Sequence, residues 1–478
     1  MNIASIIEDH DPAHIALVDG DRTLTYGELR TRTAQVRAAL AERRLAPDER
    51  VVLIAGNEPA FIVASLAVVG VGPRVVPMKP TNPVPELLRK LDVVQPSLIL
   101  VGDDAAWVLE HRDSLGAPVE LINSMTSGGE QAITPRSTDD IAFMMMTSGV
   151  SGDPKVAMLS HGSLASAQRS IVEDVVDGIN ANDVVLAALP LSHIFGLNAI
   201  MLATLRAGGR LILERRFDIG GSLELVRDHG VSILAGAPPM WRFWSLADVS
   251  PGTFDSVRIA LSGAASLSAE VFEQMRARHG VTVEEGYGMT ETASVLTSCR
   301  GLDVKQGSVG KPVPGLEMIL AEPDGSPTEV GDSGEIVVRG PLIFSGYYKD
   351  DAMTSGVMSQ DGWFWTGDVG VFDDDGYLFL IDRVKDIIIV SGFNVFPAEV
   401  ESIVSEHPDV TGAVVVGAND EMTGETVVAH VTGQVDTVAL DAFVRERLTR
   451  YKCPTTYHVV DELPIAPTGK VVRRELRT

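Results

Sequence analysis

The residues from 144 to 159, MMMTSGVSGDPKVAML, combine hydroxyls, glycines and a lysine directly after an apolar run. The apolar run predicts a strand, and residues 147–155 predict a loop in which glycines let backbone N–H groups turn toward an anion. Lys155 adds a point charge that suits phosphate. In the usual nucleotide P-loop a Ser or Thr follows the lysine and holds magnesium, but Val156 follows it here, which argues against a P-loop kinase. Taken alone, a loop of this composition is more often a plain surface turn.

Six other stretches carry residues of the kinds that bind or react with a substrate. Glu291 is a lone carboxylate between threonines in GYGMTET, and it suits a hard cation whose other ligands are phosphate oxygens. Lys470 lies in PTGK, eight residues from the end of the chain, where a lysine is normally a solvated tail charge. The remaining stretches are PLSHIFG at 190–196, SGAA at 262–265, TGD at 366–368 and DRVKD at 382–386.

The elements that would position these stretches alternate between strand and helix. Short apolar runs predict buried strands with helices between them, which together indicate a parallel α/β sheet. Ligands in such sheets bind beyond the carboxyl ends of the strands, and the polar loops named above follow predicted strands. The predicted strands cover residues 51–55, 74–77, 98–101, 184–189, 210–213, 233–235 and 259–261, and the predicted helices include 61–72 and 85–91.

From about residue 309 the pattern changes to short alternating strands, such as 335–339, separated by turn signals such as PDG and DDDG. This pattern predicts an antiparallel β subdomain. Residues 380–393 mark the expected domain junction. The roughly 90 residues that follow alternate helix and strand again and are enough for a small domain of their own.

The composition limits the possible partners. With 478 residues the chain exceeds what one hydrophobic core usually serves, so at least two domains are expected. The net charge of −26 argues against nucleic acid or an anionic membrane, but it permits a nucleotide held by local positive groups. The apolar run at 61–72 is shorter than the about 20 residues that span a bilayer. Two cysteines without metal-like spacing and a start unlike a signal peptide predict a cytoplasmic location.

These stretches, in this order, resemble the superfamily of adenylate-forming enzymes, which comprises acyl- and aryl-CoA synthetases, nonribosomal peptide synthetase adenylation domains and the beetle luciferases. The match runs from LTYGEL at 24–29 to PTGK and includes GYGMTET, WFWTGD and DRVKD. Acyl-CoA synthetases are the members that the chain resembles most. The resemblance implies doubly wound α/β sheets and a small β-barrel-like subdomain in residues 1–383, followed by a small mobile α+β domain in residues 384–478. It also implies that ATP and Mg²⁺ convert a carboxylic acid to acyl-AMP, which coenzyme A then attacks.

The resemblance implies a role at the nucleotide for several loops. Thr290 would contact the α-phosphate and Glu291 would hold Mg²⁺, while the loop at 147–155 would hold the β- and γ-phosphates. Tyr287 would stack on adenine. A solvated loop acid is the alternative for Glu291, and a buried core tyrosine is the alternative for Tyr287. The loop residues are Thr147, Ser148, Gly149, Ser151, Gly152 and Lys155, and the adenine side adds Gly263, Ala264, Ala265, Gly286 and Gly288.

Other matched residues would act at the ribose and in the domain rotation. Asp368 would accept hydrogen bonds from both ribose hydroxyls, because a carboxylate is an acceptor with two oxygens. Arg383 would assist at the ribose or phosphate, Lys385 falls at the family hinge, and Gly392 lies in the loop that would pass the pantetheine arm. Lys470 would bridge the attacking carboxylate and the α-phosphate, where charge builds up in the transition state. A surface ion pair and a plain turn are the alternatives for Arg383 and Gly392.

Two residues of the phosphate loop depart from the family pattern. Val150 replaces a usual hydroxyl residue, which removes a donor, and Val156 replaces the glycine usual after the lysine, which limits backbone freedom. We therefore expect altered pyrophosphate contacts with Lys155 retained.

The acid pocket is predicted to be apolar. His193 in PLSHIFG matches the gate beside the acid pocket, with a satisfied core histidine as the alternative. Residues 193–213 contain no Asp or Glu to bind an α-ammonium group, and Gly286 stands where malonate-type activators place an arginine. These features favour a fatty, alicyclic or aromatic acid.

The acceptor is expected to come from outside the chain, because no carrier-protein domain follows Lys470. Coenzyme A is the first expectation and a free acyl carrier protein the second. A non-catalytic binding protein of the same fold is the alternative from another class. The presence of Lys155, Glu291, Asp368 and Lys470 argues against it.

Overall fold

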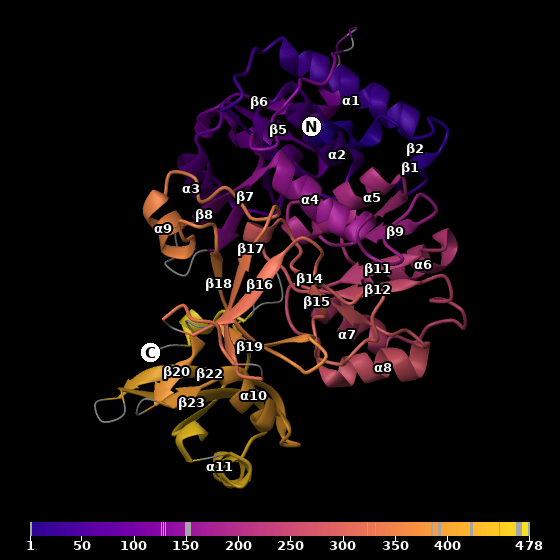
Figure 1. Ribbon diagram of the computed structural model, residues 1–478. Helices are drawn as coiled ribbons and strands as arrows, with labels where there is room; N and C mark the ends of the chain where they lie inside the picture. Colours follow the sequence, from indigo (N-terminus) through magenta and orange to yellow (C-terminus); the bar gives the residue numbers. More distant parts are fainter. Residues whose placement is uncertain are drawn as a thin grey trace. The chain divides into compact units, whose positions relative to one another are not determined.

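The computed structural model describes residues 2–125, 127, 129, 131–148, 154–322, 324–329, 331–383, 386–390, 393–420, 424–448, 450–464 and 471–476. The chain divides into two compact units. The first unit comprises Met1–Glu317 and Arg339–Phe364, and the second comprises Met318–Val338 and Trp365–Thr478. Both units are mixed α/β, as the sequence predicts (Figure 1).

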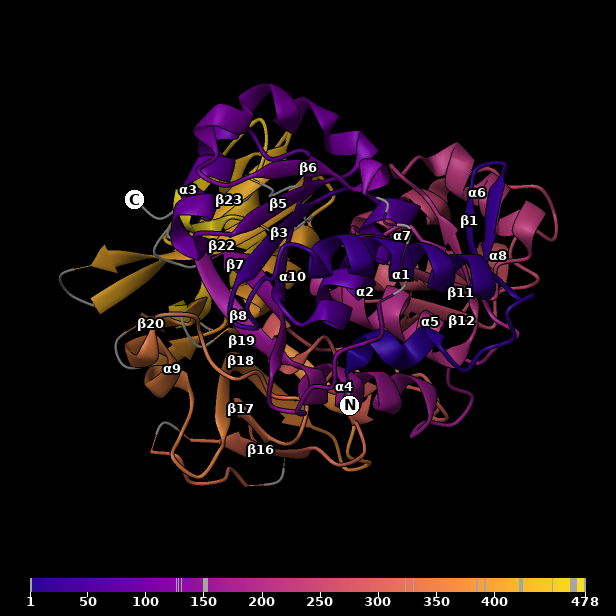
Figure 2. The ribbon, with the colours of Figure 1, turned by 90° about the horizontal axis from the view of Figure 1, so that it is seen from above.

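A six-stranded sheet in the order β6-β5-β3-β4-β7-β8 forms one half of the first unit (Figure 2). Neighbouring strands run parallel except β7 and β8, which form an antiparallel hairpin. The predicted strands at 51–55, 74–77 and 98–101 are confirmed to within one residue at each end. The strands are β3 (Arg50–Ile54), β4 (Arg74–Met78), β5 (Leu98–Val101), β6 (Val119–Leu121), β7 (Ile141–Ser148) and β8 (Pro154–Ser160).

A seven-stranded sheet in the order β13-β12-β11-β9-β10-β1-β2 forms the other half. Its strands are parallel except for the hairpin of β1 and β2. Its central strands are almost wholly buried, which explains their continuous apolar runs. The strands are β1 (Ile15–Asp19), β2 (Arg22–Thr25), β9 (Val184–Ala187), β10 (Arg210–Leu213), β11 (Ile233–Gly236), β12 (Ile259–Ser262) and β13 (Glu284–Glu285).

Helices α1 (Tyr26–Ala41) and α2 (Pro59–Val71) run side by side in this unit (Figure 2). Thr25 begins α1 with a capping box, in which its hydroxyl accepts from the Glu28 N–H and the Glu28 carboxylate accepts from the Thr25 N–H. Helix α2 is buried along nearly its whole length, which confirms the buried helix predicted from the apolar run at 61–72. Among the described residues, no helix combines the length and apolar character needed to cross a membrane.

The other helices of the first unit cover the two sheets. In Figure 1, α7 and α8 lie beside β11 and β12. The helices are α3 (Val84–Val94), α4 (His161–Val172), α5 (Ala203–Ala207), α6 (Ile219–His229), α7 (Pro238–Leu246), α8 (Ala269–His279) and α9 (Asp351–Val357), with a π-helix η4 (Phe195–Leu202) and a short strand pair β14 (Thr297–Ser298) and β15 (Lys311–Pro312).

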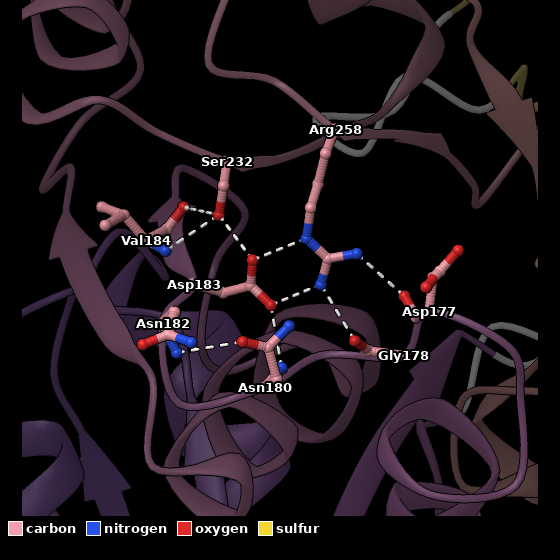
Figure 3. A network of polar contacts seen from close by, with 8 residues as sticks. All are labelled: Asp177, Gly178, Asn180, Asn182, Asp183, Val184, Ser232 and Arg258. Carbon is pink, nitrogen blue, oxygen red and sulfur yellow. Dashed lines mark hydrogen bonds and ion pairs between the residues drawn. The ribbon is translucent and has the colours of Figure 1, made fainter.

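A polar network closes the edge of the seven-stranded sheet where β9, β11 and β12 begin (Figure 3). Arg258 Nε donates to Asp183 Oδ1 at 2.7 Å, and Ser232 Oγ donates to the same oxygen at 2.7 Å. The Asn180 N–H donates to the other carboxylate oxygen at 2.8 Å. Burial alone would raise the pKa of Asp183, but these hydrogen bonds lower the pKa below its ordinary value. We call Asp183, Ser232 and Arg258 the amino-edge cluster.

The second unit contains two further sheets. The first has the order β16-β17-β18-β19, with β18 and β19 antiparallel, as expected from the turn-rich pattern after residue 309. The second has β21-β20-β23-β22 with β24 beside β23, and α10 and α11 pack on it through apolar side chains. The elements are β16 (Glu317–Ala321), β17 (Gly334–Arg339), β18 (Phe364–Phe372), β19 (Leu378–Arg383), β20 (Ile388–Val390), β21 (Phe393–Val395), α10 (Pro397–Ser405), β22 (Val410–Asp420), β23 (Gly424–Gly433), α11 (Thr437–Arg445) and β24 (Thr456–Val459).

Candidate active site

The predicted phosphate loop connects the two strands of the β7–β8 hairpin. Thr147 pairs with Lys155 across the hairpin. Val156 is buried in the core of the six-stranded sheet, so it and Lys155 occupy opposite faces of β8. The valine that replaces the family glycine is therefore a core residue. Ser148 ends β7, and Gly149, Val150, Ser151 and Gly152 lie outside the described residues.

Residues 344–348 run along the outer side of β8 and join it to the loop that contains Glu291. Tyr347 forms an antiparallel bridge with Ala157, and the Ser345 N–H donates to the Met158 carbonyl at 2.8 Å. At the start of this segment, the Phe344 N–H donates to the Glu291 carbonyl at 2.8 Å. One segment thus connects the predicted phosphate strand to the predicted metal-binding loop.

Three side chains from these segments meet at Tyr347. Its hydroxyl donates to Glu291 Oε1 at 2.8 Å. Lys155 Nζ lies 5.5 Å from the centroid of its ring. Tyr347 and Glu291 are each only 7% exposed, so Glu291 is not the solvated loop acid of the alternative interpretation. This arrangement places an oxygen ligand for a hard cation near a cation that suits phosphate.

The residues around Glu291 occupy a tight turn. A Cβ on Gly288 would collide with the carbonyl oxygen of Ser294, so only glycine fits there. Ala293 and Ser294 have φ values of +50° and +98°, which are unusual for residues with a side chain. Tyr287 is buried, and its N–H donates to Thr297 Oγ1 at 3.2 Å. The turn that carries Thr290 and Glu291 therefore contains strained backbone.

Among the described residues, no group of three or more His, Cys, Asp or Glu side chains is placed to hold a metal ion.

Glu285, at the end of β13, holds the base of this turn. Its Oε2 accepts from the Leu267 N–H at 2.8 Å. Burial raises the pKa of Glu285 to about 7, although backbone hydrogen bonds from Leu267 and Gly307 act in the opposite direction. The next residue, Gly286, donates from its N–H to the Ser262 carbonyl at 3.0 Å, which joins the turn to the segment after β12.

The small-residue segment after β12 approaches an aromatic ring. A Cβ on Gly263 would lie 2.9 Å from Cε1 of Phe195, so the absence of a side chain admits that ring. Ala264 has φ of +74°, a left-handed conformation that costs energy for alanine. Ala265 is exposed. The segment predicted to face adenine is thus a strained turn beside the predicted acid gate.

His193 begins the segment that follows β9. Its Nδ1 accepts from the Phe195 N–H at 3.3 Å, and its carbonyl accepts from the Leu197 N–H at 2.8 Å. The π-helix η4 follows, and π-helical turns are frequent at functional sites. Asn198 on η4 donates to the Ala293 carbonyl at 2.7 Å. The π-helix that follows the predicted gate is therefore linked to the predicted metal-binding turn by a direct hydrogen bond.

Comparison with known proteins identifies the family to which this chain belongs. The family described as AMP-binding enzyme matches residues 8–348, and its C-terminal domain matches residues 399–470. The chain belongs to the AMP-binding enzyme family. A feruloyl-CoA synthase of Amycolatopsis sp is 34% identical in an alignment of 491 positions, which covers 98% of this chain and 96% of that protein. The 4-coumarate–CoA ligase 3 of Oryza sativa subsp. japonica is 31% identical over 97% of this chain and 89% of that protein.

Solved structures of the family share the fold over the whole chain. ATP-bound MatB from Rhodopseudomonas palustris superposes with a TM-score of 0.93 at 30% identity, covering 100% of this chain and 98% of that chain. MenE from Bacillus subtilis, solved with its acyl-adenylate intermediate OSB-AMP, gives 0.88 at 28% identity and covers the same shares. This AMP-binding enzyme is accordingly an AMP-forming acid–thiol ligase that uses ATP, with Mg²⁺ as its usual partner, and coenzyme A. The alternative of a non-catalytic binding protein is not supported.

In the second unit of this AMP-binding enzyme, Asp368 and Arg383 are paired in register on β18 and β19. The Asp368 N–H donates to Thr366 Oγ1 at 3.1 Å, and the Thr366 hydroxyl donates to the Ile336 carbonyl at 2.8 Å. Gly367 has φ of +74°, so the TGD turn uses the conformational freedom of glycine. The two residues predicted to act at the ribose are therefore neighbours on adjacent strands.

Three predicted residues, Lys385, Gly392 and Lys470, lie outside the described residues. The chain on either side of residues 465–470 is fixed by hydrogen bonds. The Val472 N–H donates to the Pro464 carbonyl at 2.8 Å, and Arg473 donates to both carboxylate oxygens of Glu401 at 2.8 Å.

Two residues of the site were missed from the sequence. The sequence around Tyr347, in GYYKD, does not indicate a role for this residue, because its partner Glu291 lies 56 positions away. Asn198 likewise contacts a backbone carbonyl 95 positions away. The one signal available was a polar residue in the otherwise apolar run after PLSHIFG.

Proposed function

We propose that this AMP-binding enzyme activates an aromatic carboxylic acid of the hydroxycinnamate type and transfers it to coenzyme A. The observation that carries the acid class is the 34% identity with a feruloyl-CoA synthase over nearly the full length of both proteins. The chain around the gate agrees with it, because Ile194 and Leu197 are buried and apolar and residues 193–213 include no acidic residue. Fatty and alicyclic acids are the competing substrates.

The roles at the nucleotide follow from the arrangement around Tyr347. Glu291 would hold Mg²⁺, and Lys155 with the hydroxyl and glycine residues of the loop would hold the β- and γ-phosphates. Thr290 would contact the α-phosphate. When bound, the ion would neutralise charge on the phosphate oxygens while acyl-AMP forms and pyrophosphate leaves.

The remaining roles concern adenine, ribose and the acid. Tyr287 would stack on adenine beside the Gly263–Ala265 segment, with Gly286 and Gly288 allowing close approach. Asp368 would accept from the ribose hydroxyls with Arg383 beside it. His193 would border the acid pocket.

The second half of the proposal concerns domain rotation. Residues 1–383 would form the nucleotide-binding domain and residues 384–478 the mobile domain, with the hinge at Lys385. Lys470 would reach the reacting carboxylate in the first half-reaction, and the loop with Gly392 would pass the pantetheine arm in the second.

We place the enzyme in the cytoplasm, because Cys299 and Cys453 are both free, buried thiols, as is usual in a reducing compartment. A free acyl carrier protein is the competing acceptor.

The test supplies purified protein with Mg²⁺, ATP and a panel of hydroxycinnamic, benzoic, fatty and alicyclic acids. Pyrophosphate release is measured first, and the mass of the thioester is then measured with coenzyme A and separately with an acyl carrier protein. We expect the fastest release and the CoA thioester with hydroxycinnamates. Release with fatty or alicyclic acids alone would replace the acid class, a thioester on the carrier protein alone would replace the acceptor, and no release with any acid would refute acid activation.

A further inference from the structure

We propose that Tyr347 is a positioning residue for the adenylation step, whose hydroxyl orients the Glu291 carboxylate toward the divalent cation and whose ring seats Lys155. The inference rests on the proposed role of Glu291 as the metal ligand. It assigns a function to the GYYKD stretch, which the sequence motifs leave without one.

The hydrogen bond between the two side chains is of the kind that orients a ligand. The Tyr347 hydroxyl donates to Glu291 Oε1 at 2.8 Å, and both residues are 7% exposed. A hydrogen bond to a charged acceptor is stronger than one between neutral groups. Because it engages Oε1, it fixes the plane of the carboxylate and the direction in which Oε2 points. Groups that orient metal ligands in this way commonly contribute about 10- to 100-fold to metal affinity or activity.

Tyr347 is itself held from several directions. Its N–H donates to Thr354 Oγ1 at 2.9 Å, and its backbone pairs with Ala157 of β8. Its ring packs edge-on against Phe344, with centroids 4.9 Å apart and planes at 70°. Gly346, directly before it, has φ of +107°, a conformation that only glycine adopts readily. The hydroxyl therefore has little freedom to leave Glu291.

The ring of Tyr347 contacts Lys155, the other residue that we propose it positions. Lys155 Nζ lies 5.5 Å from the ring centroid, within the range of a cation–π interaction. The hydroxyl and the ring thus act on different partners. Of these two contacts, Tyr347→Phe removes the one with Glu291, whereas Tyr347→Leu removes both.

Tyr348 provides a matched control. It is the next residue, and the side chains of Arg50 and Lys349 lie over its ring at 5.9 and 5.1 Å. Tyr348→Phe therefore removes a hydroxyl from the same segment without touching Glu291.

The experiment measures Mn²⁺ binding by electron paramagnetic resonance, with a non-hydrolysable ATP analogue present and no acid. It also measures the Mg²⁺ concentration for half-maximal pyrophosphate release and the thermal unfolding midpoint. For Tyr347→Phe we expect about tenfold weaker Mn²⁺ binding and a matching rise in the Mg²⁺ requirement. Tyr347→Leu should in addition raise the KM for ATP at saturating Mg²⁺, and Tyr348→Phe should behave as wild type.

The outcomes separate this inference from the proposed function. Unchanged Mn²⁺ binding in Tyr347→Phe overturns the positioning role, even if the unfolding midpoint falls, because a merely structural tyrosine would change stability alone. Equal loss of Mn²⁺ binding in Tyr348→Phe also overturns it. Wild-type protein that binds no Mn²⁺ with the nucleotide would refute the metal-binding role of Glu291 itself.

Discussion

The two edges of the seven-stranded sheet differ in how their polar residues and backbone are arranged. At the edge where the strands begin, the charges of Asp183 and Arg258 pair with each other and with Ser232. At the edge where the same strands end, the polar loops contain strained turns. Ala264 and Ser294 have φ values of +74° and +98° there, whereas the positive φ values at the amino edge belong to Asp177 and to glycines such as Gly230, which are residue types that tolerate them.

We infer from this difference that the amino edge contributes mainly to folding stability, and that the carboxyl edge carries the loops predicted to bind and react with substrates. A buried carboxylate that accepts hydrogen bonds from Arg258, Ser232 and the Asn180 N–H holds the strand starts in place, and removing it leaves these donors without their acceptor. Strained backbone persists only where the surroundings enforce it, and it collects at ligand sites. Substitutions at the amino edge should therefore lower the free energy of unfolding and leave the activity unchanged. Substitutions of the predicted reactive residues should lower the activity and leave the free energy of unfolding unchanged.

The largest expected effect is at Lys470, which by this comparison should change activity alone. Lys470→Ala removes the cation expected at the attacking carboxylate, so acyl-AMP formation should fall by about 10²- to 10³-fold. Thioester formation from supplied acyl-AMP should change far less. Pre-formed acyl-AMP and ATP-dependent pyrophosphate release measure the two halves separately.

Lys452→Ala is the control for Lys470, because the Lys452 ammonium lies 2.7 and 2.8 Å from the oxygens of Glu399 in an ion pair of the same unit. Equal loss of both half-reactions in Lys470→Ala would contradict its role.

The opposite effect is expected at the amino-edge cluster. Asp183→Ala removes the buried acceptor shared by Arg258, Ser232 and the Asn180 N–H, so the free energy of unfolding should fall by about 1–3 kcal/mol. The rate per folded molecule should stay unchanged. Denaturant midpoints and active-site titration measure the two quantities.

The exposed pair of Arg227 and Asp228 supplies the comparison for Asp183, because Asp228→Ala should cost less than about 1 kcal/mol. A large fall in the rate per folded molecule of Asp183→Ala would break the distinction between the edges. The low pKa of Asp183 also means that this contribution is present above the ordinary pKa of 3.8 and is lost as the pH falls through the lowered value.

A smaller effect is expected at the gate. His193→Ala should raise the KM for the acid about tenfold, because a pocket contact of this size is worth about 1–3 kcal/mol. The KM for ATP should not change. His193→Asn keeps a side-chain acceptor for the Phe195 N–H, so a purely structural histidine would be rescued by Asn, and a gate would not.

The smallest effect is a pH dependence at Glu285. Because burial raises its pKa from 4.5 to about 7, the folded state favours the neutral acid. The stability that this provides is complete below about pH 4.5 and is lost as the pH rises through about 7. Glu285→Gln keeps an acceptor for the Leu267 N–H and should flatten the profile of unfolding midpoints between pH 5 and 8. An unchanged profile would mean that Glu285 is not the titrating group.

The sequence predicted the sheet strands well because continuous apolar runs such as 98–101 can only be buried strands or short core helices, and their spacing excludes helices. It missed β1 and β8. The apolar residues of β8 follow a glycine-rich loop, and nothing local indicates that the chain turns back there as an antiparallel strand. The contact of Tyr347 with Glu291 could not be predicted, because it depends on long-range pairing of residues 344–348 with β8. The roles of all the candidate site residues stay predictions, and Lys385, Gly392 and Lys470 also lie outside the described residues.

The β7–β8 hairpin has a consequence for nucleotide binding in solution. Proteins that bind phosphate through a loop followed at once by a helix use the positive end of the helix dipole. Here the strand Pro154–Ser160 follows the loop, and α4 begins only at His161. In the proposed site, point charges such as Lys155 and the metal ion would then offset the phosphate charge, and dissolved ions screen point charges at the mouth of a site. The affinity for ATP should therefore weaken as ionic strength rises.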